Sequence, residues 1–149
     1  MHKRIDKFNY YLNIAEVVAS RSSCIRRHYG AVLVKDDRIV STGYNGSPRG
    51  YLNCCDIGEC NRNINNCAKG EGYSLCSAVH AEQNALLNVS RNDTIGSTIY
   101  IVGIEHNTNE YADPHPCHIC KRFIQNAGVH KVVMRDIDGS VLITHPSEL

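Results

Sequence analysis

The chain has 149 residues, a length that suits one domain of about 150 residues. Hydrophobic residues make up 42% and charged residues 21%, as in ordinary globular proteins, which argues against extensive disorder. No apolar run approaches the roughly 18 residues of a membrane helix, and charges interrupt the N-terminus, so neither a membrane span nor a secretory signal is expected. The net charge of +1 disfavours a nucleic-acid binder, although it leaves room for a local basic patch.

Eight cysteines are the unusual feature of the composition. In a secreted chain so many cysteines would predict a disulfide framework, whereas in a cytosolic chain they more often serve metal binding or catalysis. Because the N-terminus does not resemble a secretory signal, we expect a cytoplasmic protein whose cysteines bind metal or stay free.

The first half of the chain predicts a helix, a hairpin and a long irregular segment. Apolar side chains recur every three or four residues over residues 4–20, which indicates an amphipathic helix. Two β-branched runs at 31–35 and 38–43 are separated by two aspartates and predict a hairpin. Residues 45–72 are rich in Asn, Gly and Cys, and a loop of that length is unusual unless something ties it down.

The second half predicts two helices and three strands. A helix over residues 78–89 would have Ser77 as its N-cap. Pro116 would begin a second helix, which Gly128 ends. The expected strands are residues 98–104, 130–134 and 140–144, with a polar loop over 105–115. Helices alternating with strands predict an α/β protein, a three-layer α/β/α sandwich with a mixed sheet of about five strands in one domain, residues 1–149. The strand–helix–strand unit over 98–134 should be parallel, with a right-handed crossover.

Two short motifs carry the candidate chemistry. They are His80-Ala81-Glu82 and the run from Pro116 to Cys120, each at a predicted helix start. Cys117 and Cys120 lie three residues apart and share a helix face. With His80 they offer zinc two thiolates and an imidazole, three protein ligands that leave the fourth position open for water, as in catalytic sites. The unpaired N–H groups at a helix start favour the negative charges of such thiolates.

Glu82 follows His80 by two residues, so its carboxylate would lie beside the metal without being forced to bind it. Two thiolates weaken the acidifying effect of the metal on its water, which makes a nearby general base useful. Either motif alone is a weak signal. In this order, H-x-E followed by P-C-x-x-C is the pattern of zinc nucleobase deaminases.

Three further stretches resemble the cytidine and deoxycytidylate deaminase superfamily, and most of all its deoxycytidylate (dCMP) deaminases. They are YGAVLV at 29–34, TGYNGSPRG at 42–50 and HAEQNAL at 80–86, and the resemblance extends over most of residues 5–135. It implies hydrolytic deamination of dCMP to dUMP and ammonia, in pyrimidine nucleotide metabolism. The implied roles are zinc binding for His80, Cys117 and Cys120, and proton transfer for Glu82.

The resemblance also implies substrate contacts. Asn45 and Ala81 would contact the sugar or base. The side-chain amide of Asn45 can both donate and accept hydrogen bonds, which suits a hydroxyl group or a base edge. Taken alone, an Asn-Gly pair more often marks a turn. Arg26, Arg27 and Arg49 are the candidates for binding the phosphate, because arginine binds phosphate bidentately. Each of them would otherwise be interpreted as a solvated surface residue.

The resemblance further implies a second, structural zinc ion, which would hold the irregular segment over residues 45–72 in one conformation. The ligands we favour are Cys24, Cys55, Cys60 and Cys76, with buried free thiols as the alternative. The family also implies a homo-oligomer, in particular a hexamer, and control by dCTP and dTTP, but no residue here defines an interface.

Other functions stay open on the sequence alone. A related zinc deaminase could act on cytidine, guanine or adenosine in RNA, and the 105–115 loop is longer than expected beside the site. The low net charge and aromatic content argue against a nucleic-acid substrate. A non-catalytic zinc module would have no need of Glu82.

Overall fold

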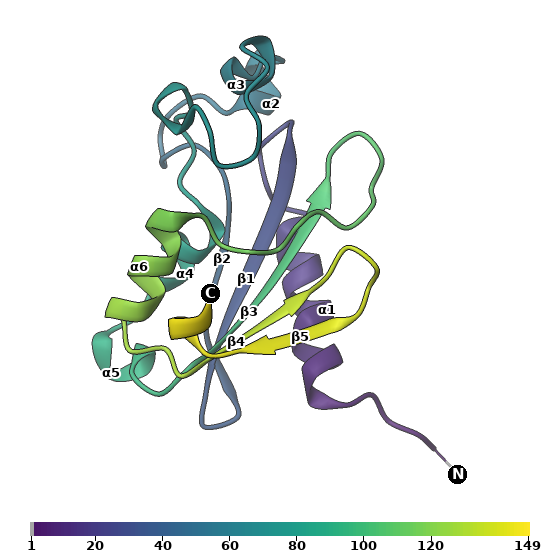
Figure 1. Cartoon of the computed structure of the whole chain (residues 1–149), viewed down its shortest axis with the longest axis vertical. Helices are drawn as coiled ribbons and strands as arrows, with labels where there is room; N and C mark the ends of the chain where they lie inside the picture. Colours follow the sequence, from purple (N-terminus) through teal and green to yellow (C-terminus); the bar gives the residue numbers. More distant parts are fainter. Residues whose placement is uncertain (1) are drawn as a thin grey trace.

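The computed structural model describes residues 2–149, and its five strands form one mixed sheet in the order β2-β1-β3-β4-β5 (Figure 1). Strand β1 is antiparallel to both β2 and β3, β3 is parallel to β4, and β5 returns antiparallel to β4. The predicted hairpin and the predicted parallel pair are therefore confirmed. The strands are β1 (Arg27–Lys35), β2 (Arg38–Tyr44), β3 (Thr98–Glu105), β4 (Lys131–Arg135) and β5 (Val141–Thr144).

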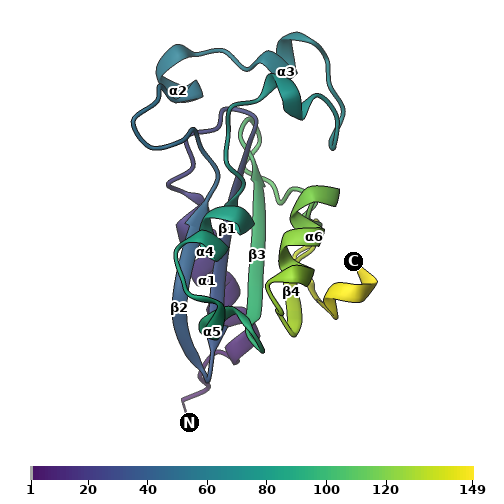
Figure 2. The ribbon, with the colours of Figure 1, turned by 90° about the vertical axis from the view of Figure 1, so that its left-hand side faces the viewer.

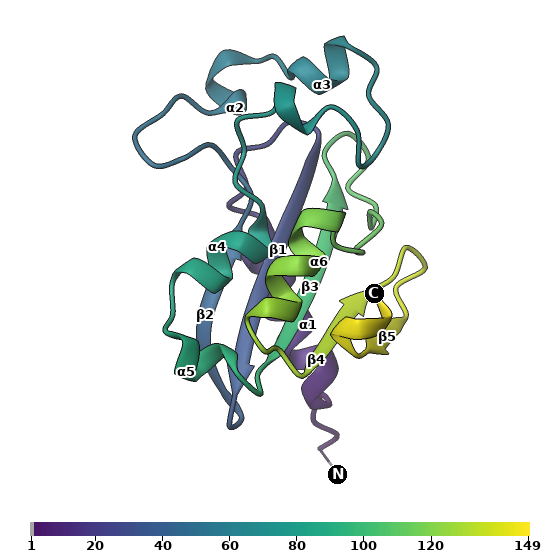
Figure 3. The same cartoon turned by 60° about the vertical axis from the view of Figure 1, so that its left-hand side comes forward.

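Helices cover both faces of this sheet, as the predicted three-layer α/β/α sandwich requires. Figure 3 shows α4 (Ala81–Leu87) and α6 (His118–Asn126) in front of the sheet and α1 (Lys7–Ala19) behind it. The remaining short elements are α2 (Cys54–Ile57), α3 (Asn61–Ile64), α5 (Arg91–Thr94) and the 3₁₀ turns Tyr73–Leu75 and Pro146–Glu148. None of the described helices is long and apolar enough to cross a membrane.

The core lies in two layers, one on each side of the sheet. Successive side chains of β1 point to opposite faces. Val32 packs with Leu12 under α1, whereas Leu33 packs with Ala85 and Ile124 under α4 and α6. All five side chains are fully buried. Burying a side chain of this size stabilises the fold by about 1.5–3 kcal/mol, so these contacts fix the helices on the sheet.

The position of α4 depends on a close approach to β2. A Cβ atom on Gly43 would lie 2.4 Å from both the Ala81 carbonyl oxygen and the Ala85 backbone nitrogen. The hydroxyl of Ser41 also donates a hydrogen bond of 2.6 Å to the Ala85 carbonyl oxygen. Helix α4 therefore rests directly on the backbone of β2, and its first turn is held at a fixed height above the sheet.

The sequence misplaces the starts of four elements. Helix α1 begins at Lys7, after the N-cap Asp6, and not at residue 4. Strand β1 begins at Arg27 and not at residue 31, because its pairing with β3 continues to Glu105. Helix α4 begins at Ala81, with His80 and not Ser77 in the N-cap position. Residues before His80 stay extended because Val79 exchanges backbone hydrogen bonds with Gly46.

Helix α6 also begins later than predicted. Its first residue is His118, and Cys117 is the N-cap, whose Sγ accepts a hydrogen bond from the Cys120 backbone nitrogen at 3.4 Å. Pro116 thus precedes the cap and is not the first helical residue. Gly128 follows the helix with a φ of 78°, the left-handed conformation that ends many helices, as predicted.

Residues 45–76, the cysteine-rich segment, lie beyond the end of the sheet at which β1 begins and β2 and β3 end (Figure 2). Two arginines hold this segment together. Arg26 donates to the Asn63 side chain and to the Cys67 carbonyl oxygen, and Arg62 donates to backbone oxygens of the same segment. The predicted long loop therefore contains two one-turn helices, and arginine side chains satisfy several of its carbonyl groups.

Candidate active site

The two sequence motifs meet where α4 and α6 begin. His80 and Cys117 are the N-cap residues of the two helices, and Cys120 lies in the first turn of α6. The Nδ1 atom of His80 lies 3.6 Å from the Cys117 Sγ and 3.2 Å from the Cys120 Sγ. Within residues 2–149 these three side chains form the one group of three or more potential ligands whose atoms all lie within 4.8 Å of one another.

The geometry of this group fits a tetrahedral zinc ion. Zn–N bonds of about 2.0–2.1 Å and Zn–S bonds of about 2.3 Å place the N and S atoms of two ligands about 3.6 Å apart. The two separations from His80 are close to this value. Hydrogen bonds from Cys120 and His80 lower the pKa of Cys117 to about 3, although partial burial opposes them, and this shift favours the thiolate form that binds zinc. The hydrogen bond between the two sulfurs raises the pKa of Cys120. Soft thiolates with one imidazole are a donor set that zinc prefers.

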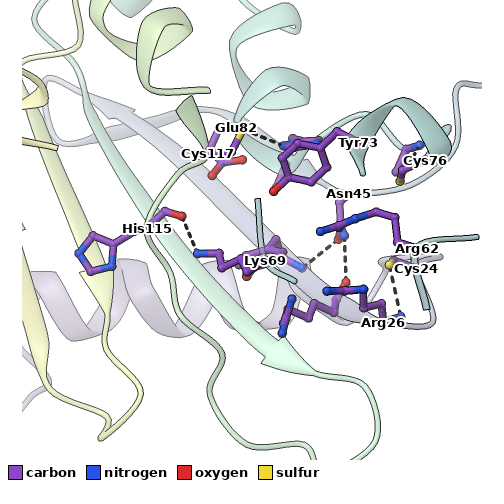
Figure 4. A pocket seen from close by; sticks show the side chains of 15 residues that line it. Cys24, Arg26, Asn45, Arg62, Lys69, Tyr73, Cys76, Glu82, His115 and Cys117 are labelled. Carbon is purple, nitrogen blue, oxygen red and sulfur yellow. Dashed lines mark hydrogen bonds between the residues drawn. The ribbon is translucent and has the colours of Figure 1, made fainter. Parts of the chain in front are cut away.

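Glu82 is buried beside this group, in the first turn of α4 (Figure 4). The residue is only 5% exposed, and this burial raises the pKa of its carboxyl above the ordinary value. Its own backbone N–H, the charge of His80 and a hydrogen bond with Cys120 act in the opposite direction. A carboxyl with a raised pKa can accept a proton and release it again near neutral pH, which is the requirement for general acid–base catalysis.

A pocket opens over Glu82 and over two of the predicted metal ligands, His80 and Cys117. Strand β1, the start of α4, the cysteine-rich segment and the loop before α6 contribute its walls. The ring of Tyr73 stands edge-on to the imidazole of His80, with ring centroids 5.0 Å apart, and so forms the wall next to the metal ligands.

Asn45 and Ala81, the predicted substrate contacts, both line this pocket. The Asn45 side chain is also bound to β1, because its Oδ1 accepts from the Tyr29 backbone nitrogen at 2.8 Å and its Nδ2 donates to the Arg27 carbonyl oxygen at 2.9 Å. Each end of the amide keeps one further hydrogen-bonding position. Contact with substrate therefore stays a prediction for Asn45, whose structural role in holding β1 is shown by these bonds.

The three arginines proposed as phosphate ligands do not lie together. Arg26 and Arg27 line the pocket, whereas Arg49 is exposed and lines a separate cavity beside the end of β2. The structure therefore does not bring Arg49 to the site, because the chain turns away after Asn45. Arg27 is bound to Glu105, with 2.8 Å between its Nε and the carboxylate.

Sequence reasoning missed four side chains of the pocket, Arg62, Lys69, Tyr73 and His115. Lys69 joins the cysteine-rich segment to the loop before α6, since its Nζ donates to the carbonyl oxygens of Asp113 and His115 and lies 3.1 Å from the Asp113 carboxylate. These residues lie in stretches without periodicity or motif, so no sequence signal placed them. The 105–115 loop, noted for its length, does reach the pocket through His115.

Four cysteines, three of them in the cysteine-rich segment, line a second, smaller cavity. They are Cys24, Cys54, Cys60 and Cys76. Cys55, which we had placed in this group on the sequence, is exposed instead, and its neighbour Cys54 lies in the cavity. In a single helical turn, adjacent residues point in different directions, so only one of the pair can face inward.

Comparison with known proteins gives consistent matches. The family model of the cytidine and deoxycytidylate deaminase zinc-binding region matches residues 5–135. The deoxycytidylate deaminase of Mycobacterium phage D29 is 41% identical over 135 residues, 87% of this chain and 94% of the phage protein. That of Schizosaccharomyces pombe is 36% identical over 125 residues, 84% of this chain but 35% of the yeast protein. The crystal structure of dCMP deaminase from cyanophage S-TIM5 with dCMP and dUMP has a TM-score of 0.65 at 29% identity, covering 90% of this chain and 84% of that one.

Proposed function

The chain belongs to the cytidine and deoxycytidylate deaminase family, and from this premise we propose that it deaminates dCMP hydrolytically to dUMP and ammonia. One observation carries the proposal: the metal-ligand group of His80, Cys117 and Cys120 borders a pocket, and Glu82 is buried beside it. The phage relatives named as deoxycytidylate deaminases support the choice of dCMP among the possible substrates.

His80, Cys117 and Cys120 would hold the zinc ion, and bound zinc supplies a Lewis acid that activates water. The Glu82 carboxylate accepts a proton from the water whose oxygen bonds to C4 of cytosine. It delivers this proton to N3 of the ring, and it then takes the proton of the new C4 hydroxyl and passes it to the amino nitrogen. C4=O forms as the C4–N bond breaks, and ammonia leaves. Burial keeps the pKa of Glu82 raised, so the carboxyl can hold the proton between these two transfers.

The test is the loss of cytosine absorbance when zinc-loaded protein meets dCMP, with cytidine, deoxycytidine and dCTP measured in parallel. We expect turnover of dCMP in preference to the other three. Glu82→Gln should lower kcat by about 10²–10⁴-fold, the usual contribution of a general acid–base, while the protein keeps its zinc. A Glu82→Gln protein with wild-type turnover would refute the mechanism. Zinc-loaded protein that turns over none of the four compounds would refute the proposal that dCMP is the substrate.

The second zinc belongs to the same proposal, with a changed ligand set. Cys24, Cys54, Cys60 and Cys76 line one cavity, and burial together with the neighbouring thiols raises the pKa of Cys54. Four cysteine ligands without an open position are typical of structural zinc sites, which stabilise folded segments directly. Such an ion would bring these thiols together and order the cysteine-rich segment.

Metal analysis distinguishes the two ligand sets. We expect two zinc ions per wild-type chain, one in Cys54→Ser and two in Cys55→Ser, which is the matched control because the two residues are adjacent. One zinc ion in the wild type would refute the second site. Loss of zinc from Cys55→Ser, with none lost from Cys54→Ser, would restore the ligand set that the sequence suggested.

The assembly and location of the protein are also part of the proposal. Its family membership supports a homo-oligomer, with a hexamer as the specific expectation, and a cytoplasmic enzyme of nucleotide metabolism. Light scattering coupled to size-exclusion chromatography measures the mass directly. A monomer at assay concentrations would refute the first of these expectations.

A further inference from the structure

Two histidines meet on the face of the sheet that is turned away from the active site. Side chains alternate between the two faces of a strand, and Val32 and Val34 of β1 pack toward α1. His28 precedes them by an even number of residues, so it lies on the same face, where it lines a cavity with residues of α1. Its neighbours Arg27 and Tyr29 line the active-site pocket on the other face.

His106 reaches the same place from the end of β3. The pairing of β1 with β3 places His28 opposite Ile104. The ladder continues past the last residue of β3, because the His106 nitrogen donates to the Arg26 carbonyl oxygen at 3.2 Å. His106 therefore follows Ile104 by two residues and lies on the same face, as a diagonal neighbour of His28.

One nitrogen of each imidazole ring lies close to one nitrogen of the other. The Nδ1 atom of His106 is 3.1 Å from the Nε2 atom of His28, and the ring centroids are 5.1 Å apart. Metal–nitrogen bonds of about 2.0–2.1 Å, with an angle of about 90–109° at the ion, place two ligand nitrogens about 2.8–3.4 Å apart. The pair therefore has the spacing of two ligands of one metal ion.

The surroundings of the two histidines suit a cation. Burial, and then the charge of His106, lower the pKa of His28, although a hydrogen bond with the Cys24 backbone opposes them. A neutral imidazole has the free lone pair that a metal ligand requires. Glu16 lines the cavity beside His28, and its carboxylate, which accepts from the Tyr111 hydroxyl at 2.6 Å, adds a negative charge to this face. His106 is exposed, so water can supply the remaining ligands.

We propose that His28 and His106 bind a divalent transition-metal ion between their facing nitrogens, apart from the sites proposed for zinc. Imidazole binds Zn²⁺, Ni²⁺ and Cu²⁺, whereas Mg²⁺ and Ca²⁺ require oxygen ligands. The ring that donates the hydrogen bond in the free protein moves its proton to its other nitrogen through solvent, so both rings bind as neutral ligands. Because the β1–β3 ladder already fixes both residues, binding requires little further ordering.

The alternative is a hydrogen bond between two neutral rings that bind no ion. A second pair of histidines in the chain provides the comparison. The rings of His130 and His145 stand edge-on with centroids 6.0 Å apart, but the Nδ1 atom of His145 is bound to Ser147 and not to the other ring. Replacing His130 therefore removes a histidine from a similar pair without removing a matched pair of ligand nitrogens.

The experiment is a calorimetric titration of the zinc-loaded protein with Ni²⁺, which imidazole binds and which does not favour tetrahedral thiolate sites. The variants are His28→Ala, His106→Ala and the double variant, with His130→Ala as the control. We expect one Ni²⁺ ion per wild-type chain. Each single variant should bind Ni²⁺ about 100-fold more weakly or worse, because the second ligand no longer acts at high effective concentration. The double variant should be little weaker than either single variant, since one change already removes the chelate.

Zinc content and urea unfolding complete the test. Saturating Ni²⁺ should raise the urea midpoint of the wild type and of His130→Ala, and leave that of His106→Ala unchanged, because an ion bound to the folded state stabilises it. Wild-type Ni²⁺ affinity in His28→Ala or in His106→Ala overturns the inference, and so does Ni²⁺ binding that releases an equivalent of zinc. Equal affinity for Mg²⁺ also overturns it, because oxygen ligands would then hold the ion. If His28→Ala does not fold, the exposed His106 decides the question through its own variant.

Discussion

Gly43 offers a direct test of how the sheet positions the active site. An alanine Cβ at this position would lie 2.4 Å from the Ala81 carbonyl oxygen and the Ala85 nitrogen, whereas ordinary contact begins near 3.4 Å. Relieving the overlap requires α4 to move by about 1 Å, and both contacts are backbone atoms, which cannot rotate away. Gly43 does not have a positive φ, so the alanine itself fits its strand conformation.

Gly43→Ala should therefore act through the displaced helix. We expect a loss of about 1–3 kcal/mol in the free energy of unfolding, as in other overpacked cores, reduced by the 0.4–1 kcal/mol that alanine contributes through the unfolded state. His80 and Glu82 would move with the first turn of α4. A misplacement of about 1 Å can lower catalysis by about 100-fold, and we expect that loss in kcat/KM for dCMP.

The assay measures kcat/KM at a temperature at which urea unfolding shows every variant to be folded. Gly30→Ala is the matched control, because its Cβ would collide with Ala15 of α1 on the opposite face of the sheet. It should lose stability with a much smaller change in kcat/KM. Equal activity losses in the two variants would refute the reasoning, as would a destabilised Gly43→Ala protein with wild-type kcat/KM.

Two further predictions concern the residues around the pocket. Asn45→Ala should lower the free energy of unfolding by about 1–3 kcal/mol for each β1 backbone group that it leaves unpaired, measured by urea denaturation; wild-type stability would show that these hydrogen bonds do not hold the strand. Burial raises the pKa of Asp113, but hydrogen bonds from His115 and Lys69 outweigh it and lower that pKa from 3.8 to about 2. Because the folded-state pKa is depressed, the stabilisation by Asp113 is present above pH 3.8 and is lost as the pH falls toward 2. Asp113→Asn should thus be less stable than the wild type at pH 7, and a difference that did not shrink over this acid range would contradict the assignment.

The layered fold and the metal ligands follow from the sequence because both depend on local signals. The apolar runs at 31–35, 38–43 and 98–104 predicted the three strands β1, β2 and β3. The metal ligands could be paired because His80 and Cys117 each lie at a helix start, and two helix starts on one face of a sheet come close together. The exact starts of α4 and α6 depended on contacts distant in sequence, such as that between Val79 and Gly46, which local periodicity does not encode.

The residues at the arginine-lined end of the pocket could not be predicted in this way, because they come from a segment without periodicity. Arg62 is buried where residues 68–71 and the ring of Tyr73 cover its guanidinium. The exchange of Cys55 for Cys54 has the same origin, since a helix of one turn is too short to show which side faces inward. A charged residue in such a segment is interpreted as solvated by default, and only the folded arrangement shows that its charge lacks a partner.

The residues placed by local signals and those placed by contacts distant in sequence also have different roles in the site. The groups that perform the chemistry stand on helices fixed by the sheet, where Gly43 and Ser41 leave α4 little freedom to move. Catalytic geometry tolerates only small displacements, which favours such rigid supports. Arg26 and Arg62, which line the pocket, are oriented instead by carbonyl groups of the cysteine-rich segment. Since loops tolerate sequence change more readily than core elements, substrate preference can change there while the metal ligands and Glu82 keep their positions.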